Sequence, residues 1–148
     1  MPGPNVVVIP DYLPDMKAWL KTHPTLTPLH GGRVFFRIPT KQGQWPILRI
    51  YQLNGGIIGD GGDANVSQID LSIETVGAPG SFDYTTVRQL AIAVESVMWT
   101  MPAGTLLNPG GGPTVALSAR AMNKIDSQDP DTGSPRIVLD SRWQIQGL

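Results

Sequence analysis

Residues 66–76 alternate strictly between apolar and polar side chains, and this pattern is typical of a β-strand with one buried face. Ile69, Leu71 and Ile73 fall on one side of such a strand, because successive side chains point to opposite faces. The polar residues of the other side are Gln68, Asp70, Ser72 and Glu74. One face of the predicted sheet therefore lies on an apolar core, and the other is either wet or against a polar partner.

A second periodic segment predicts a long helix at 83–101. Asp83 can cap its start, and Pro102-Ala103-Gly104 ends it. Its apolar residues recur at intervals of three and four, the spacing of one helical face. They are Val87, Leu90, Ala91, Val94, Val97, Met98 and Met101. We expect this helix to lie across the apolar face of the sheet.

The remaining periodic segments predict one shorter helix and four more strands. The helix covers 11–22, with Asp11 as its cap and Pro14 in its first turn. The strands are expected at 33–38, 47–53, 114–124 and 136–145, the first two joined as a hairpin with a projecting loop. The order α-β-β-β-α-β-β predicts a single α+β domain, residues 1–148. Its sheet is antiparallel or mixed, with about five strands and two helices packed on one face.

Three segments are expected to be mobile loops, at about 54–65, 108–113 and 126–135. The first is dense in glycine, and glycine costs conformational entropy to order. It also carries Asp60 and Asp63, which suggest either a weak contact with a divalent cation or a solvated turn. The remaining ligands of a calcium loop are missing after Asp63, so we favour the solvated turn.

The composition excludes several kinds of chemistry. The chain has no cysteine, which rules out disulfides, thiol nucleophiles and thiolate metal sites. The net charge of -1 predicts no general attraction to nucleic acid or to anionic membranes. No window approaches the roughly 20 apolar residues of a membrane span. We expect no membrane partner, and use in a cytoplasm or in a particle assembled there.

The search for a reactive site is mostly negative. His23 and His30 lie beside turn residues without metal-binding spacing and are interpreted as surface residues of a loop. Asp70 and Glu74 share a strand face but stand about 13 Å apart, too far for the usual pair of catalytic carboxylates. The sequence therefore predicts no catalytic residue, no metal ligand and no cofactor.

Several short sequence segments resemble those of a known family. They are Pro28-Leu29-His30-Gly31-Gly32-Arg33-Val34-Phe35, Trp45-Pro46-Ile47-Leu48-Arg49-Ile50, Leu53-Asn54-Gly55-Gly56, Val66-Ser67-Gln68-Ile69-Asp70-Leu71 and Leu90-Ala91-Ile92-Ala93-Val94-Glu95. With the order of elements, they resemble the tail-terminator and neck proteins of long-tailed, siphovirus-type bacteriophages, from about residue 11 to 145. In relatives an aromatic residue often precedes the glycine after the third strand, whereas this chain has Thr75-Val76-Gly77.

The resemblance implies a structural virion protein that is not an enzyme. It implies a homo-oligomeric ring, usually a hexamer, which caps the tail tube, stops its polymerisation and joins the tail to the head. The partners would be further copies of the chain, the tail tube protein and a head-completion protein, with DNA only as cargo in the lumen. The location would be the tail neck of a virion assembled in the host cytoplasm.

The candidate contacts with other subunits or with the tube lie on two strands and one loop. They are Arg49, Tyr51, Gln68, Asp70, Ser72, Glu74, Asp60 and Asp63. Within the same class, a head-closure protein or a tail-tube relative remains an alternative. A small ligand-binding or regulatory module is an alternative of another class. An enzyme that uses Asp70 and Glu74 is a third reading, which the spacing of these carboxylates disfavours.

Overall fold

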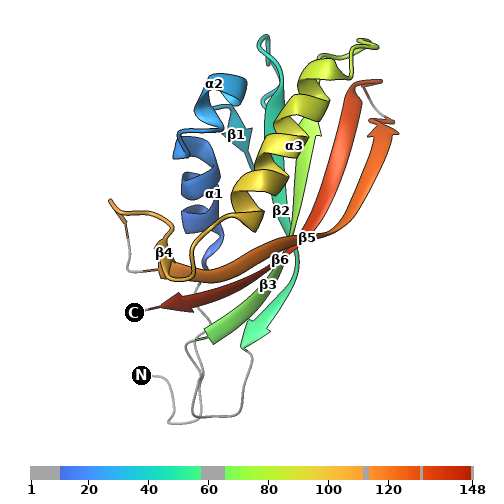
Figure 1. Ribbon diagram of the computed structural model, residues 1–148. Helices are drawn as coiled ribbons and strands as arrows, with labels where there is room; N and C mark the ends of the chain where they lie inside the picture. The colour runs from blue at the N-terminus through green and yellow to red at the C-terminus, as the bar shows by residue number, and fades with distance from the viewer. Residues whose placement is uncertain (1–10, 58–65, 112–113, 131, 148) are drawn as a thin grey trace, which may run out of the picture.

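The computed structural model describes residues 11–57, 66–111, 114–130 and 132–147. Within them the chain forms one curled, six-stranded sheet with its helices on one side (Figure 1). The helices are α1 (Leu13–Thr22), α2 (Thr27–His30) and α3 (Thr85–Trp99). The strands are β1 (Val34–Phe35), β2 (Ile47–Ile57), β3 (Val66–Val76), β4 (Thr105–Leu106), β5 (Thr114–Gln128) and β6 (Pro135–Gly147). None of the described helices is long and apolar enough to span a bilayer.

The strands lie in the order β1-β2-β3-β6-β5-β4. Every neighbouring pair is antiparallel except β1 and β2, which are parallel. The predicted α+β class with a mixed sheet is therefore confirmed, but the described residues hold six strands and three helices rather than about five and two. Strands β1 and β4 contain only two residues each, so they cover short stretches of the two sheet edges.

The hairpin predicted for 33–53 is wrong. Val34 lies opposite Leu48 in a parallel pair, so the chain from 36 to 46 returns to the end of the sheet where it began. Pro39 and Pro46 prevent a regular strand along that path, because proline has no N–H to donate to a ladder.

The predicted loops begin or end at different residues. Strand β2 runs on to Ile57, with an irregularity in register between Gln52 and Asn54, so 54–57 are strand rather than loop. Strand β5 extends to Gln128 and β6 starts at Pro135, which shortens the last loop to 129–134. Residues 58–65, with Asp60 and Asp63, lie outside the described residues, as do 112 and 113.

The core lies between α3 and the apolar side of β3 and β6. The predicted helical stripe is buried as expected, except that Met101 is only partly buried. Ile69, Leu71 and Ile73 of β3 belong to the same cluster. Asp11 and Asp83 each accept the N–H of the residue two positions later, at 3.1 and 2.9 Å. Both acidic residues therefore fix the chain's entry into a helix, one position earlier than an ordinary N-cap.

A chain of hydrogen bonds anchors the largest buried side chain, Trp143. Its Nε1–H donates to Ser141 Oγ at 2.9 Å, and that hydroxyl donates to the carbonyl of Leu71 at 2.8 Å. Trp19 of α1 meets the Trp143 ring edge-on at 5.6 Å between centroids. The contact between the two tryptophan rings thus packs α1 against the sheet. The indole N–H of Trp143 keeps a hydrogen-bond partner within the sheet itself.

His30 is fully buried, and its interpretation as a surface residue is wrong. The N–H of Gly32 donates to Nδ1 at 2.9 Å, so the ring proton is on Nε2, 2.9 Å from the carbonyl of Leu20. The neutral ring joins α1 to α2. Burial lowers the pKa of His30 and the charge of Arg33 lowers it further, against the opposing effect of the Leu20 carbonyl.

This burial predicts loss of stability in mild acid. Below the ordinary histidine pKa of 6.5 the unfolded chain binds a proton that folded His30 resists, so the free energy of unfolding falls as the pH falls from 6.5. Urea unfolding at pH values from about 5.5 to 8 measures this slope. In His30→Gln, which keeps a donor and an acceptor, the slope should diminish. An unchanged slope would contradict the assignment.

Candidate functional site

The sheet side that faces away from the helices brings together six of the predicted contact residues. Arg49 lies opposite Glu74, and Tyr51 lies opposite Ser72, in the β2–β3 ladder. Gln68 and Asp70 continue the same side of β3. Asp60 and Asp63 lie outside the described residues, so their predicted role stays a prediction.

This side is far more buried than the sequence suggests. The exposed fraction is 8% for Asp70, 0% for Ser72 and 2% for Glu74, although a wet or partner-facing surface was predicted. The cause is the position of β3 inside the sheet, where the longer side chains of β2 and β6 flank it on both sides. A strand pattern fixes which residues share a face, but it does not fix how far their neighbours cover them.

Arginines from the flanking strands hold both carboxylates of β3. Arg49 Nε donates to Glu74 Oε2 at 2.6 Å, and Arg136 Nη1 lies 3.6 Å from Glu74 Oε1. Arg142 binds Asp70 through Nε at 2.9 Å and Nη2 at 3.2 Å. The hydrogen bonds to Asp70, followed by its charge, raise the pKa of Arg142. Both acidic groups thus serve as fixed acceptors that join β2, β3 and β6.

This arrangement gives the two carboxylates a structural role. The oxygens of both carboxylates already accept hydrogen bonds from arginines of neighbouring strands, which fixes their position in the sheet. Among the residues that the structure describes, no three histidine or acidic side chains gather closely enough to hold a metal ion. The buried hydroxyls of Ser67 and Ser72 have no hydrogen-bond partner among the residues that the structure describes.

A second surface, which the sequence analysis missed, lies around β5. The side chains of Trp99 and Ile92 are 79% and 53% exposed on the outside of α3. They line a hollow of about 410 Å³ with Ala121 of β5. Their spacing of seven, off the buried stripe, is a signal that the sequence contained: it places two large apolar residues together on the outer face of the helix.

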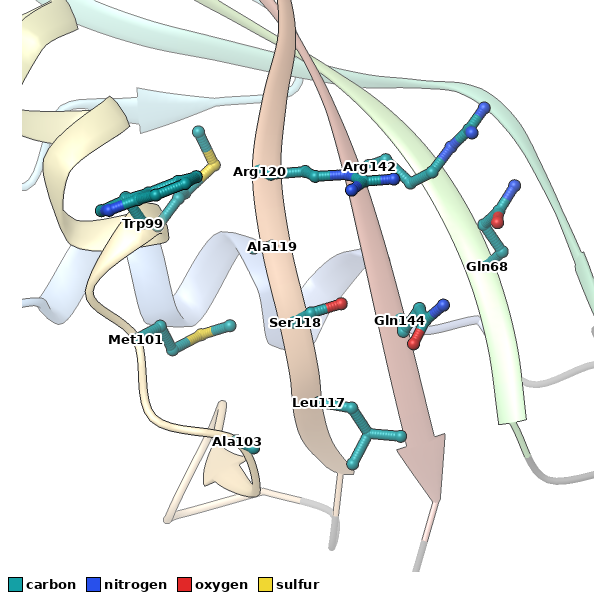
Figure 2. Close-up of a pocket in the computed structure, with 11 residues that line it drawn as sticks. Gln68, Trp99, Met101, Ala103, Leu117, Ser118, Ala119, Arg120, Arg142 and Gln144 are labelled. Carbon is teal, nitrogen blue, oxygen red and sulfur yellow. The ribbon is translucent and has the colours of Figure 1, made fainter.

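A further hollow of about 410 Å³ surrounds β5 nearer its start. Figure 2 shows Trp99 and Met101 on one side of β5 and the side chains of Arg120 and Arg142 on the other. The register of β5 shifts between Ala116 and Ser118 at this point. Strand β5 therefore separates an apolar surface next to α3 from a polar surface on the outer side of the sheet.

Comparison with known proteins finds a likeness of fold. The sequence matches no family profile and no curated protein. The structure is similar to a chain in the solved structure "Virion of native gene transfer agent (GTA) particle", with a TM-score of 0.64 and 18% sequence identity. The likeness covers 87% of this chain and 90% of that chain. At this identity it shows a shared fold.

Removal of Glu74 of β3 and of Glu95 of α3 should change the free energy of unfolding by unequal amounts, because only the ion pairs of Glu74 lie inside the sheet. Glu74→Ala leaves Arg49 and Arg136 without their shared acceptor inside the sheet, and should reduce the free energy of unfolding by about 2 kcal/mol. Glu95→Ala removes an exposed pair with Lys124 and should change it by less than about 0.5 kcal/mol. Urea unfolding of both variants compares them. Equal losses would mean that the Glu74 pairs are as weak as a surface pair.

Proposed function

We propose that this chain is a structural subunit of a phage-like virion, and that it acts as a tail terminator. The likeness to a chain of the gene transfer agent virion, over 87% of this chain, carries the proposal. The resemblance of the sequence to tail-terminator and neck proteins supports the more specific role. We propose no enzymatic activity, since the carboxylates once considered for it are held by arginines.

The mechanism is steric. A subunit that binds its own copies head to tail needs two different complementary surfaces, and such contacts close into a ring when the rotation between copies is right. The ring, by resemblance a hexamer, seats on the head-proximal end of the tail tube and prevents the next tube subunit from adding. Its opposite face then binds a head-completion protein, and DNA passes through the lumen.

The chain's properties are compatible with such a subunit. Only 16% of its residues are charged, below the average of about 25%, so much of its surface is neutral or apolar. Large apolar side chains remain exposed at several places, including Trp99, Phe82 and Leu53. Apolar surface of this kind is costly in a free monomer and is useful in a subunit that other subunits cover.

The proposal predicts a closed oligomer of the purified protein. Native mass spectrometry over a wide range of concentration should give one dominant assembly near six subunits, and negative-stain electron microscopy should show rings. Long tubes would point instead to a tail-tube relative. A monomer or dimer under every condition, with and without divalent cations, would contradict the prediction that the ring forms before it binds the tube.

A functional measurement separates a terminator from other neck proteins. In coexpression with a tail tube protein from the same genome, a terminator should shorten the tubes as its amount rises, because it caps growing ends. Tube length that does not depend on its amount would contradict the terminator role and favour a head-closure role.

A further inference from the structure

The sheet has two open edges within the described residues. On its outer side β5 pairs with β4 only at Val115 and Ala116, which leaves 117–128 unpaired. On the opposite edge β2 pairs with β1 only at Leu48 and Arg49, which leaves 50–57 unpaired. Unpaired strand edges readily add another strand, so proteins usually shorten or cover them. Here both remain long.

The two open stretches lie at the same height in the sheet. The ladders connect Tyr51 to Ser72, Ser72 to Asp140 and Asp140 to Asn123, so one row crosses from the first edge to the second. Three antiparallel steps separate β2 from β5, so these two strands run in opposite directions. A second copy in the same orientation would therefore bring its β2 alongside β5 in antiparallel pairing. At equal height β1 of that copy would meet β5 at Ile125 and Asp126, so the pairing either ends before these residues or is displaced along the strands toward Gln128.

Exposed apolar side chains accompany both edges. On β2, Tyr51 is 40% exposed and Leu53 is 47% exposed. On β5, Met122 and Ile125 are 44% and 46% exposed. The hollow of about 410 Å³ between α3 and β5 adds Ile92 and Trp99 on the helix side of this edge. A strand added to β5 would thus cover apolar surface as well as satisfy backbone groups.

The two edges differ in their charge. The open stretch of β2, residues 50–57, contains no charged residue. The open stretch of β5 contains Arg120, Lys124 and Asp126, and Lys124 pairs with Glu95 of α3. Arg120 has no ion pair among the described residues. A contact between β5 and the uncharged stretch of β2 therefore brings no like charges together, whereas a contact between two copies of β5 would bring two charged edges together.

We propose that the open edge of β5, residues 117–128, binds the open edge of β2, residues 50–57, of a second copy of this chain. The two strands pair in antiparallel fashion, and Trp99 and Ile92 pack against the added strand. This inference rests on the proposed function, because it names the contact that closes the ring. It assigns the contact to two edges of one sheet rather than to the carboxylates of β3.

A disulfide test uses the absence of cysteine from the chain. In one subunit, β2 and β5 are three strand spacings apart, about 14 Å, and a disulfide needs Cα atoms within about 7 Å. In Tyr51→Cys/Asn123→Cys, any disulfide must therefore join two copies. Under mild oxidation we expect a ladder of covalent multimers that ends at the ring size, on a denaturing gel without reductant. Moving the second cysteine through 120–128 allows for a shift in register.

The single-cysteine variants are the controls, and each should stay monomeric on that gel. Efficient dimers of Asn123→Cys alone would mean that β5 pairs with β5 and would overturn the proposal. A ring of the unmodified chain in native mass spectrometry, without a ladder at any position, would overturn this contact and leave the proposed function standing. The absence of both ring and ladder would overturn the two together.

A matched pair of substitutions tests the apolar part of the contact. Trp99→Ala should raise the dissociation constant of the assembly at least about tenfold, because buried tryptophans carry much of the energy of an interface. Phe82→Ala removes an aromatic side chain that is 86% exposed and lies on neither edge, and should leave assembly unchanged. Circular dichroism of both variants checks that the fold is retained. Equal effects on assembly would contradict a role for Trp99 in this contact.

Discussion

The long antiparallel pairing of β3 with β6 is the constraint on which the rest of the structure depends. It runs from Val66 opposite Gln146 to Val76 opposite Arg136, with one residue facing one residue throughout. On the helix side this register sets Ile69 beside Trp143, and on the other side it sets Asp70 beside Arg142. A slip of one residue would exchange the two faces, placing charges in the core and isoleucines outside. The core and the ion pairs therefore stabilise the same register.

The sequence predicts those features that depend on local periodicity. The alternation over 66–76 gives the bounds of β3, and the spacing of Val87, Leu90 and Val94 gives the buried face of α3. It does not predict the parallel pair of β1 and β2, since a strand of two residues has no periodic pattern. Nor does it predict the burial of His30, because the hydrogen-bond partner of its buried ring is the carbonyl of Leu20 in another helix. Features that depend on distant neighbours leave no signal in their own segment.

The candidate site likewise combines a feature that local periodicity predicts with one that depends on distant neighbours. Alternation correctly groups Gln68, Asp70, Ser72 and Glu74 on one face, but their environment depends on arginines from β2 and β6. Once Asp70 and Glu74 are held inside the subunit, they are poor choices for contacts with another chain, because breaking such pairs leaves charges unmatched. The surface available for contact thus moves from the middle of the sheet to its edges, where Tyr51, Leu53 and Met122 are exposed.

The two short strands give those edges a defined length. Strand β1 covers Leu48 and Arg49 at one end of the sheet, and β4 covers Val115 and Ala116 at the other end. The rows left open on both edges are therefore the middle ones, from Leu139 to Gln144 as counted along β6. Two edges that were open along their whole length would permit many registers and irregular aggregates. In the proposed contact, β1 of the second copy and β4 of the first would each occupy a position next to an edge strand, which excludes the registers that overlap them. Thus β1 and β4, which add little to the core, would restrict the register in which one subunit meets the next.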